Sequence, residues 1–257
     1  MKYRSILLFA VLLFPPLSAF ADNHGPMYAR LFTAEVEPNS QRAYEEVLKK
    51  FAAAHKQLDT ERYYGVSTQV VGSPTTYTFV SIFRSFADMD LAPMNVMVDA
   101  YGAEEAGGMG ASIEGKVLSQ ETGIWTRRLD LSPTQPDDAE TPAMTNWLLV
   151  TVKPYGNGDY EAYLKKVSEA WDQTDAGAPF VVWAPGPGGN NTYAFANPIA
   201  SWASMDEGTF VSVPQRLQQA FGADEAQRLL KQRAAVVESQ TIYLSRSRPE
   251  LSYLPEE

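Results

Sequence analysis

Hydrophobic and polar residues follow the same succession of patterns twice along the chain. Each succession opens with a stretch of alternating apolar and β-branched residues, at 28–37 and again at 145–153, and this alternation predicts a strand. An apolar residue at every third or fourth position then predicts an amphipathic helix. The apolar positions of these two helices are Tyr44, Leu48, Phe51, His55 and Leu58 in the first half, and Tyr160, Leu164, Val167 and Trp171 in the second.

Two strands, a second helical region and a final strand complete each half. Glycine and proline separate the two middle strands, at 72–74 in the first half and at 185–189 in the second, as expected of tight connections. The resulting order, β-α-β-β-α-β, is that of the ferredoxin-like unit. The later strands are predicted near 63–71, 75–83 and 120–129 in the first half, and near 180–183, 192–196 and 240–246 in the second.

Identical residues recur at a constant spacing, which indicates an internal duplication. The spacing is 116 residues from Pro38 to Asp90 and 120 from Gly102 onward, and chance similarity would not keep it so long. We predict tandem modules at 22–132 and at 144–257, the latter with a C-terminal tail, joined by a proline-rich acidic linker at 133–143. The matched pairs include Tyr44 with Tyr160, Glu45 with Glu161, Ser119 with Ser239, and Arg128 with Arg248.

The first 21 residues have the features of a cleavable export signal. Lys2 and Arg4 precede an apolar run, and Ala19-Phe20-Ala21 has the form of a cleavage site. A membrane anchor is the alternative, but two prolines interrupt the run and it is shorter than the roughly 20 residues of a spanning helix. The sequence therefore predicts a periplasmic or secreted protein without stable membrane insertion.

Charge and cysteine content exclude several classes of site. The formal net charge is −10, with no basic stripe, so nucleic acid is not an expected partner. Cysteine is absent, which excludes disulfides, thiolate nucleophiles and cysteine-bound metals. Since His24 and His55 are the only histidines and no spaced carboxylates form a calcium loop, we expect neither a metal nor a cofactor.

The duplication and the order of elements resemble the dimeric α/β-barrel superfamily, which includes antibiotic-biosynthesis-type monooxygenases and the EthD-like and NIPSNAP-like proteins. An early Pro-x-x-x-x-x-Tyr-Glu opening at 38–45 and a late Ser-Gln pair at 119–120 carry the resemblance, which covers nearly all of the chain after residue 21. It implies an α+β protein whose two modules pack sheet to sheet as one intramolecular α/β barrel. Haem-binding members of the superfamily use a histidine in the second helical region, where neither half of this chain has one.

Strand alternation then predicts which side chains face the barrel interior. Val150 and Ile124 belong to the helix-covered side of their strands, together with Leu244, so residues of the opposite parity face inward. The inward residues with the most binding potential are Trp147, Trp125 and Tyr243, with Glu35, Glu121 and Arg127 as polar groups.

Two interpretations of these inward residues stay open at this point. The aromatic side chains either fill the core between the sheets, as in many small barrels, or line a pocket. A pocket indicates non-catalytic binding of a small apolar or aromatic ligand, because no paired acid and base is recognisable. A cofactor-independent monooxygenase is the alternative, for which Asn146-Trp147 is the local candidate, and an interaction module that forms homo-oligomers is a third.

Three other features have structural explanations in the sequence. His55 corresponds to Trp171 in the second half, which favours a packing role. The glycine-rich segment 186–189 lies between two strands and lacks the lysine of a phosphate loop, so we predict a hairpin turn. The methionine- and glycine-rich region 89–110 is a weak helix, a mobile lid or a subunit contact.

Overall fold

The computed structural model describes residues 27–90, 95–134, 142, 144–174, 180–205 and 212–254. Within them, eight antiparallel strands close into a single barrel in the order β1-β3-β2-β8-β5-β7-β6-β4. The predicted export signal and most of the predicted linker lie outside the described residues.

The element bounds agree with the predicted order in both halves. The first half contains β1 (Tyr28–Val36), α1 (Gln41–Gln57), β2 (Gly65–Val71), β3 (Thr76–Phe83), α2 (Val96–Tyr101), α3 (Ala103–Ile113) and β4 (Val117–Arg127). The second half contains β5 (Met144–Val152), α4 (Asn157–Gln173), β6 (Val181–Pro185), β7 (Thr192–Ile199), α5 (Val213–Phe221), α6 (Ala223–Val236) and β8 (Val237–Ser247).

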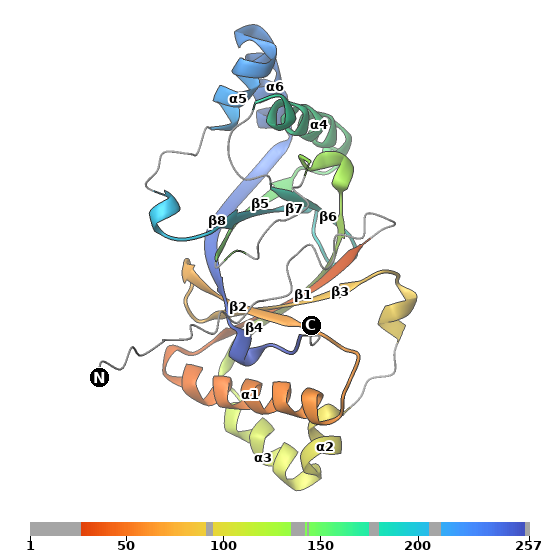
Figure 1. Ribbon diagram of the computed structural model, residues 1–257, viewed down its shortest axis with the longest axis vertical. Helices are drawn as coiled ribbons and strands as arrows, with labels where there is room; N and C mark the ends of the chain where they lie inside the picture. Colours follow the sequence, from red (N-terminus) through yellow and green to blue (C-terminus); the bar gives the residue numbers. More distant parts are fainter. Residues whose placement is uncertain are drawn as a thin grey trace, which may run out of the picture.

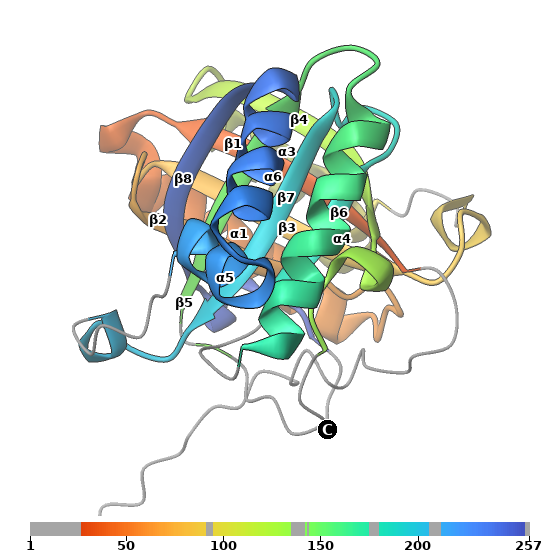
Figure 2. The same cartoon turned by 90° about the horizontal axis from the view of Figure 1, so that it is seen from above.

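Helices cover the barrel on two opposite sides. In Figure 1, α1, α2 and α3 lie below the strands and α4, α5 and α6 lie above them, so the two sheets form the middle layers. Figure 2 shows α4 and α6 running side by side across the upper sheet. The structure is therefore an α+β barrel with four layers, helix, sheet, sheet, helix.

The same strand order occurs in both halves, and two long-range pairings close the barrel. Each half follows the order fourth, first, third, second: β4-β1-β3-β2 and β8-β5-β7-β6. Ser67 on β2 pairs with Ser247 on β8, and Arg127 on β4 pairs with Trp183 on β6. Both junctions join a second strand of one half to a fourth strand of the other, so neither sheet keeps a fully free edge.

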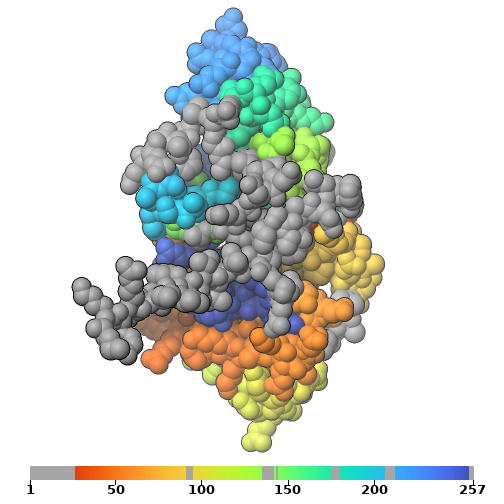
Figure 3. Space-filling view, viewed as in Figure 1, coloured from red at the N-terminus to blue at the C-terminus, as the bar shows by residue number. Residues whose placement is uncertain are grey.

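After each final strand, the chain crosses to the other half. The Arg128 amide donates to the Val182 carbonyl at 2.9 Å, and the Arg248 amide donates to the Val66 carbonyl at 2.8 Å. Figure 3 shows the dark blue end of the chain against the orange surface of the first half. The two crossings have the same geometry. Ser132 Oγ accepts from the Val182 amide at 2.9 Å, and Ser252 Oγ accepts from the Val66 amide at 2.8 Å.

Three layers of apolar packing follow from strand alternation. One cluster lies between α1 and its sheet, a second lies between α4, α6 and theirs, and a third, which we call the inner cluster, lies between the sheets. Val150 belongs to a helix-covered cluster, as predicted, and Ala34 on β1 belongs to the other. Leu244 has the predicted parity, but it packs with Met144 and Ile199 in a separate small cluster instead of under a helix. The inner cluster comprises Met27, Ala29, Val181, Trp183 and Ala194, with Leu31, Val80, Ile82, Trp125, Trp147, Leu149 and Ala196 packed against them.

The second helical region of each half is two helices, broken at a glycine. Gly102 between α2 and α3 has φ of 80°, and Gly222 between α5 and α6 has φ of 84°. Residues with a Cβ rarely adopt this left-handed conformation, which explains the break. The methionine- and glycine-rich region is thus a pair of short helices, and its residue Met94 lies outside the described residues.

Candidate functional site

Trp125 and Trp147 face the same space between the two sheets, as strand alternation predicts. Trp125 lies opposite Ala29 on β1, and Trp147 lies opposite Ala196 on β7. All four residues belong to the inner cluster, in which both tryptophans remain partly exposed. Partly exposed tryptophans inside a closed barrel indicate accessible space beside them, and this makes the inner surface the candidate site.

The Trp125 ring is positioned by a glycine and a carbonyl. A Cβ at Gly123 would lie 2.5 and 2.6 Å from Cη2 and Cζ3 of Trp125, so the indole occupies the place of a side chain at 123. Its Nε1 donates to the Thr192 carbonyl oxygen at 2.9 Å. Since indole has a single donor, this bond fixes the ring orientation and leaves an apolar face for contacts.

Trp147 is held by its two cross-strand neighbours on β8. Its Nε1 donates to Ser245 Oγ at 2.9 Å, and its ring stacks on Tyr243 with a centroid distance of 6.4 Å and an interplanar angle of 21°. Such pairs add to the free energy of area burial alone. Trp147 and Tyr243 therefore form one aromatic wall of the barrel.

The Tyr243 hydroxyl is an available donor on this wall. It forms no hydrogen bond with the described residues, and burial raises the pKa of Tyr243 to about 12. The phenol is consequently protonated at neutral pH. It can donate a hydrogen bond to a bound molecule, but it is not poised as a general base.

Arg127 is the basic group of the inner surface. It follows Trp125 by two residues on β4 and lies opposite Trp183 on β6. Its Nη1 lies 4.0 Å from the Met27 sulfur, and its buried Nε has no hydrogen-bond partner in the part of the chain that the structure describes. Burial, and then the positive charge of Arg84, lower the pKa of Arg127 from its usual value.

The predicted acidic groups lie towards the opposite end of β1 and β4 from Trp125. Glu121 lies opposite Thr33, and Glu35 lies opposite Ser119, both on the inward parity, whereas Trp125 lies opposite Ala29 nearer the other end of β4. Glu121 is exposed and Glu35 half-buried, because this end of β4 extends beyond the residues that pair with β6. Alternation along a strand predicts the facing of a side chain but not its depth in the barrel, so the role of these acids as polar groups of the site stays a prediction.

Asn146 does not share the barrel interior with Trp147. It is paired with Leu244 and therefore lies on the outward parity. The polar group beside Trp147 is Tyr243 instead. Sequence reasoning also missed Trp183, only 7% exposed, which the alternation of Val181, Val182 and Trp183 could have placed on the inner surface.

His55 lies outside the barrel, in an aromatic cluster under α1. It stacks on Tyr253, touches Phe51 and Tyr64 edge-on, and its Nδ1 lies 2.5 Å from Thr60 Oγ1. Burial lowers the pKa of His55 from its ordinary value, with a smaller contribution from Arg62. The environment is that of a packed core histidine.

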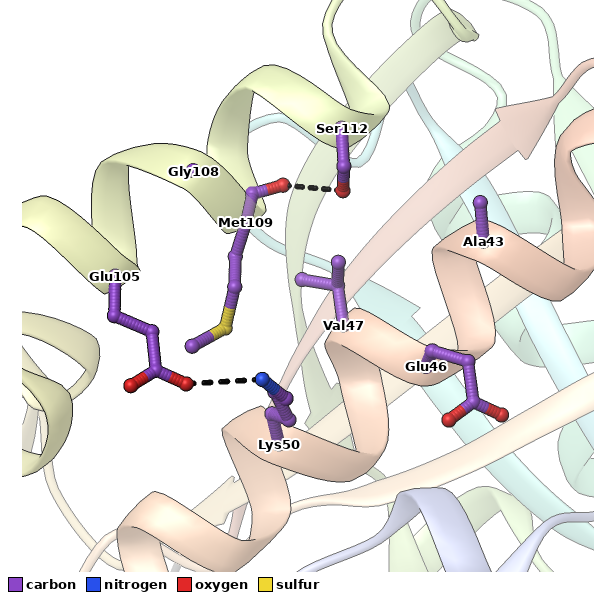
Figure 4. Close-up of a pocket in the computed structure, with 8 residues that line it drawn as sticks. All are labelled: Ala43, Glu46, Val47, Lys50, Glu105, Gly108, Met109 and Ser112. Carbon is purple, nitrogen blue, oxygen red and sulfur yellow. Dashed lines mark hydrogen bonds and ion pairs between the residues drawn. The ribbon is translucent and has the colours of Figure 1, made fainter.

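A groove with a volume of about 460 Å³ opens on the helical layer between α1 and α3. Figure 4 shows Met109 and Val47 at its floor and the Lys50–Glu105 ion pair across it. The pair measures 3.0 Å, with about half of each side chain exposed, so it contributes little specificity or stability. Among its lining residues, Glu46 has a pKa lowered by its hydrogen bond with Lys49, but that carboxylate is exposed to solvent. We therefore place the candidate site in the barrel.

Within the described ranges, no three His, Asp or Glu residues are grouped so that they could hold a metal ion. No described helix is long and apolar enough to cross a membrane.

Comparison with known proteins identifies the fold. No protein-family model matches the chain, and curated proteins supply no match either. Among solved structures, it is similar to a candidate monooxygenase from Lactobacillus acidophilus (11% identity, TM-score 0.51, covering 90% of this chain and 96% of that one). A candidate monooxygenase from Fusobacterium nucleatum gives 9% identity, TM-score 0.51 and coverage of 87% and 93%. An anthrone oxidase-like protein shares 13% sequence identity with a TM-score of 0.51, and the match covers 86% of this chain and 91% of that one. These likenesses concern the fold, a ferredoxin-like α/β barrel.

Proposed function

We propose that this protein is exported to the periplasm and binds a small apolar or aromatic molecule inside its barrel. The observation that carries the proposal is the partial exposure of Trp125 and Trp147 within the inner cluster. Interiors filled by side chains leave few voids larger than a water molecule. Indoles that remain accessible between two packed sheets favour an aromatic guest over a filled core.

A fluorescent probe tests this binding. Phenylnaphthylamine is uncharged and aromatic, and its emission rises in apolar surroundings. We expect saturable binding to the native protein, and Trp147→Ala should weaken it at least tenfold while the fold survives. Trp202→Ala is the matched control, because Trp202 lies outside the inner cluster and is 46% exposed. No binding to the native protein, with Trp147→Ala losing about 3–5 kcal/mol of stability, would establish a filled core instead.

A cofactor-independent monooxygenase is the second candidate function. Tyr243 favours it, as a protonated hydroxyl beside Trp147 that no described residue engages. In this chemistry the substrate supplies the electrons, while the protein excludes water and orients the substrate. The fold is similar to those of a candidate monooxygenase and an anthrone oxidase-like protein, and this similarity is the reason for choosing anthrone as the substrate in a test of this function.

Anthrone is that substrate, since one O₂ converts it into anthraquinone and one water. We expect oxygen uptake with anthrone to accelerate with native protein and to fall in Tyr243→Phe. Tyr155→Phe is the control, because Tyr155 is completely exposed. Equal rates with and without protein would leave ligand binding as the function.

The repeated strand order also supports a tandem duplication as the origin of the barrel. Each half has the order fourth, first, third, second, and the crossing bonds of Arg128 and Arg248 repeat between them. Two single-module chains can form such a barrel as a dimer. After a tandem duplication, the two modules of one chain can form the same barrel within that chain.

A further inference from the structure

We propose that the ligand of the barrel is an aromatic or apolar organic anion, and that Arg127 binds its anionic group. The proposal rests on the proposed function, because Arg127 belongs to the same inner surface as the aromatic residues. It follows Trp125 by two residues on β4, and alternate residues of a strand face the same side about 7 Å apart. A molecule that contacts an indole on this surface thus reaches the guanidinium with a short substituent.

The partners of Arg127 differ from those of its neighbour in sequence. Arg128 faces the other way and binds Glu161 through Nη1 and Nη2, at 2.9 and 3.0 Å, and Asp130 through Nε. Among the described residues, the Arg127 guanidinium has a polar contact only with the Met27 sulfur, 4.0 Å from Nη1, and none of them accepts a hydrogen bond from its buried Nε. A buried guanidinium donor without an acceptor is unfavourable, and the oxygen of a bound anion would satisfy it.

A second positive charge acts on Arg127. Arg84 follows Phe83, the residue of β3 that pairs with Tyr28, and its charge acts on Arg127. Two guanidinium groups that act on each other in this way repel. An anion between them or beside Arg127 reduces this repulsion, whereas a neutral or cationic ligand does not.

Opposite charges mark the two ends of the inward face of β4. Glu121 lies six residues before Arg127, or about 20 Å along a strand, and Glu35 lies near Glu121 on β1. The acidic end repels an anionic group and the Arg127 end attracts it. The inward face therefore orients an amphiphilic anion, with its charge towards Arg127 and its apolar part along Trp125 and Trp147.

Arg127 does not correspond to an arginine in the second half of the barrel. Arg128 matches Arg248 at the spacing of 120 residues, and both bind carboxylates across the two halves. The residue that corresponds to Arg127 is Ser247, also on the inward parity. The fold closes at that junction without an arginine, so Arg127 serves something other than closure.

Two matched probes test the charge requirement. Anilinonaphthalene sulfonate is phenylnaphthylamine with a sulfonate added, so the pair isolates the effect of one anionic group. We expect the sulfonate to bind the native protein at least tenfold more tightly than its neutral counterpart, the contribution of one charged hydrogen bond. Arg127→Met should abolish that difference by weakening the binding of the sulfonate at least tenfold.

Arg246→Met is the matched control, because Arg246 contacts the Met144 sulfur at 3.9 Å but lies on the outward parity of β8. It should keep the preference for the sulfonate. A second readout is thermal: the sulfonate should raise the melting temperature of the native protein more than that of Arg127→Met. If both probes bind equally well to native protein and Arg127→Met, the anion proposal is overturned and the binding function stands. If neither probe binds, both are overturned.

Discussion

Arg128, at the end of the first half, forms a two-pronged ion pair with Glu161 on α4 of the second half. The relationship is reciprocal, because Arg248 at the end of the second half binds Glu45 on α1 of the first half at 2.8 Å. A buried tyrosine hydroxyl donates to each glutamate, from Tyr193 to Glu161 at 3.0 Å and from Tyr77 to Glu45 at 2.9 Å. The end of each half is therefore bound by an ion pair to the first helix of the other half, and these pairs hold the two halves together where the barrel closes.

Breaking one of these pairs should destabilise the whole barrel. Arg128→Met leaves the Glu161 carboxylate mostly buried with only Tyr193 as a donor, so we expect a loss of about 1–3 kcal/mol in the free energy of unfolding. Urea denaturation measures it. Lys49→Met removes the exposed Lys49–Glu46 pair and should cost less than about 0.5 kcal/mol. Equal losses of unfolding free energy in both variants would show that the Arg128–Glu161 pair does not stabilise the barrel more than an exposed ion pair does.

The Glu45 pair predicts a dependence of stability on pH. A hydrogen bond from Arg248 holds the pKa of Glu45 below its ordinary 4.5. Since the folded pKa is the lower one, the stabilisation is complete above pH 4.5 and is lost as the pH falls further. The difference in unfolding free energy between the native protein and Glu45→Gln should therefore be constant near neutrality and shrink below about pH 4.5.

Glu104→Gln provides the comparison for this experiment, because Glu104 is an exposed residue of α3 outside the described ion pairs. Its stability difference from the native protein should stay small throughout. A Glu45→Gln difference that persists unchanged into acid would assign the effect to packing of the side chain.

Local pattern predicted the elements and their facing, because both depend on nearby residues. The alternation around Trp147 and Trp125 placed both indoles inside the barrel, since a strand presents successive side chains to opposite faces. The repeated helix positions at Tyr44 and Tyr160 likewise both lie in helix-covered clusters.

Long-range pairing could not be predicted in the same way. Where Glu121 lies relative to the barrel depends on how far β6 extends along β4, and β6 pairs only with the last three residues of that strand. The bond between Arg128 and Glu161 joins residues 33 apart across two halves, and no pattern within either half specifies it. Alternation within the last strand predicted that Tyr243 faces inward, but its stacking on Trp147 depends on β8 pairing with β5 and could not be predicted from either strand alone.

Export is a separate prediction from the sequence. Expression of the complete gene in a Gram-negative host should release a mature protein whose first residue is Asp22, because Ala19-Phe20-Ala21 forms the expected cleavage site. N-terminal sequencing of the periplasmic fraction identifies that residue. An intact Met1 in a membrane fraction would favour the anchor, and changing Ala21 to a bulky residue should block processing if the prediction is correct.

His55→Phe should separate packing from binding. The ring fits among Phe51, Tyr64 and Tyr253, so we expect a loss below about 1.5 kcal/mol and unchanged affinity for phenylnaphthylamine. Since the folded pKa of His55 is lowered, the unfolded chain binds the proton more readily, and native stability should fall as the pH drops below about 6.5. Urea titrations at several pH values should show a smaller fall in the variant. Loss of probe binding without loss of stability would make His55 a functional residue.

Gly123 should be the most sensitive glycine of the inner surface. A methyl group at this position overlaps the Trp125 ring, which lies 2.5 Å from the added Cβ, so the indole must leave its place and its bond to the Thr192 carbonyl. We expect Gly123→Ala to cost about 1–3 kcal/mol and to weaken probe binding, with a shift in tryptophan emission. Gly110→Ala on α3 meets nothing within 4 Å and should instead stabilise by about 0.5–1 kcal/mol, because alanine favours helix. If Gly123→Ala keeps native stability and emission, the Trp125 ring does not depend on the missing side chain, and its role as a fixed wall of the site is refuted.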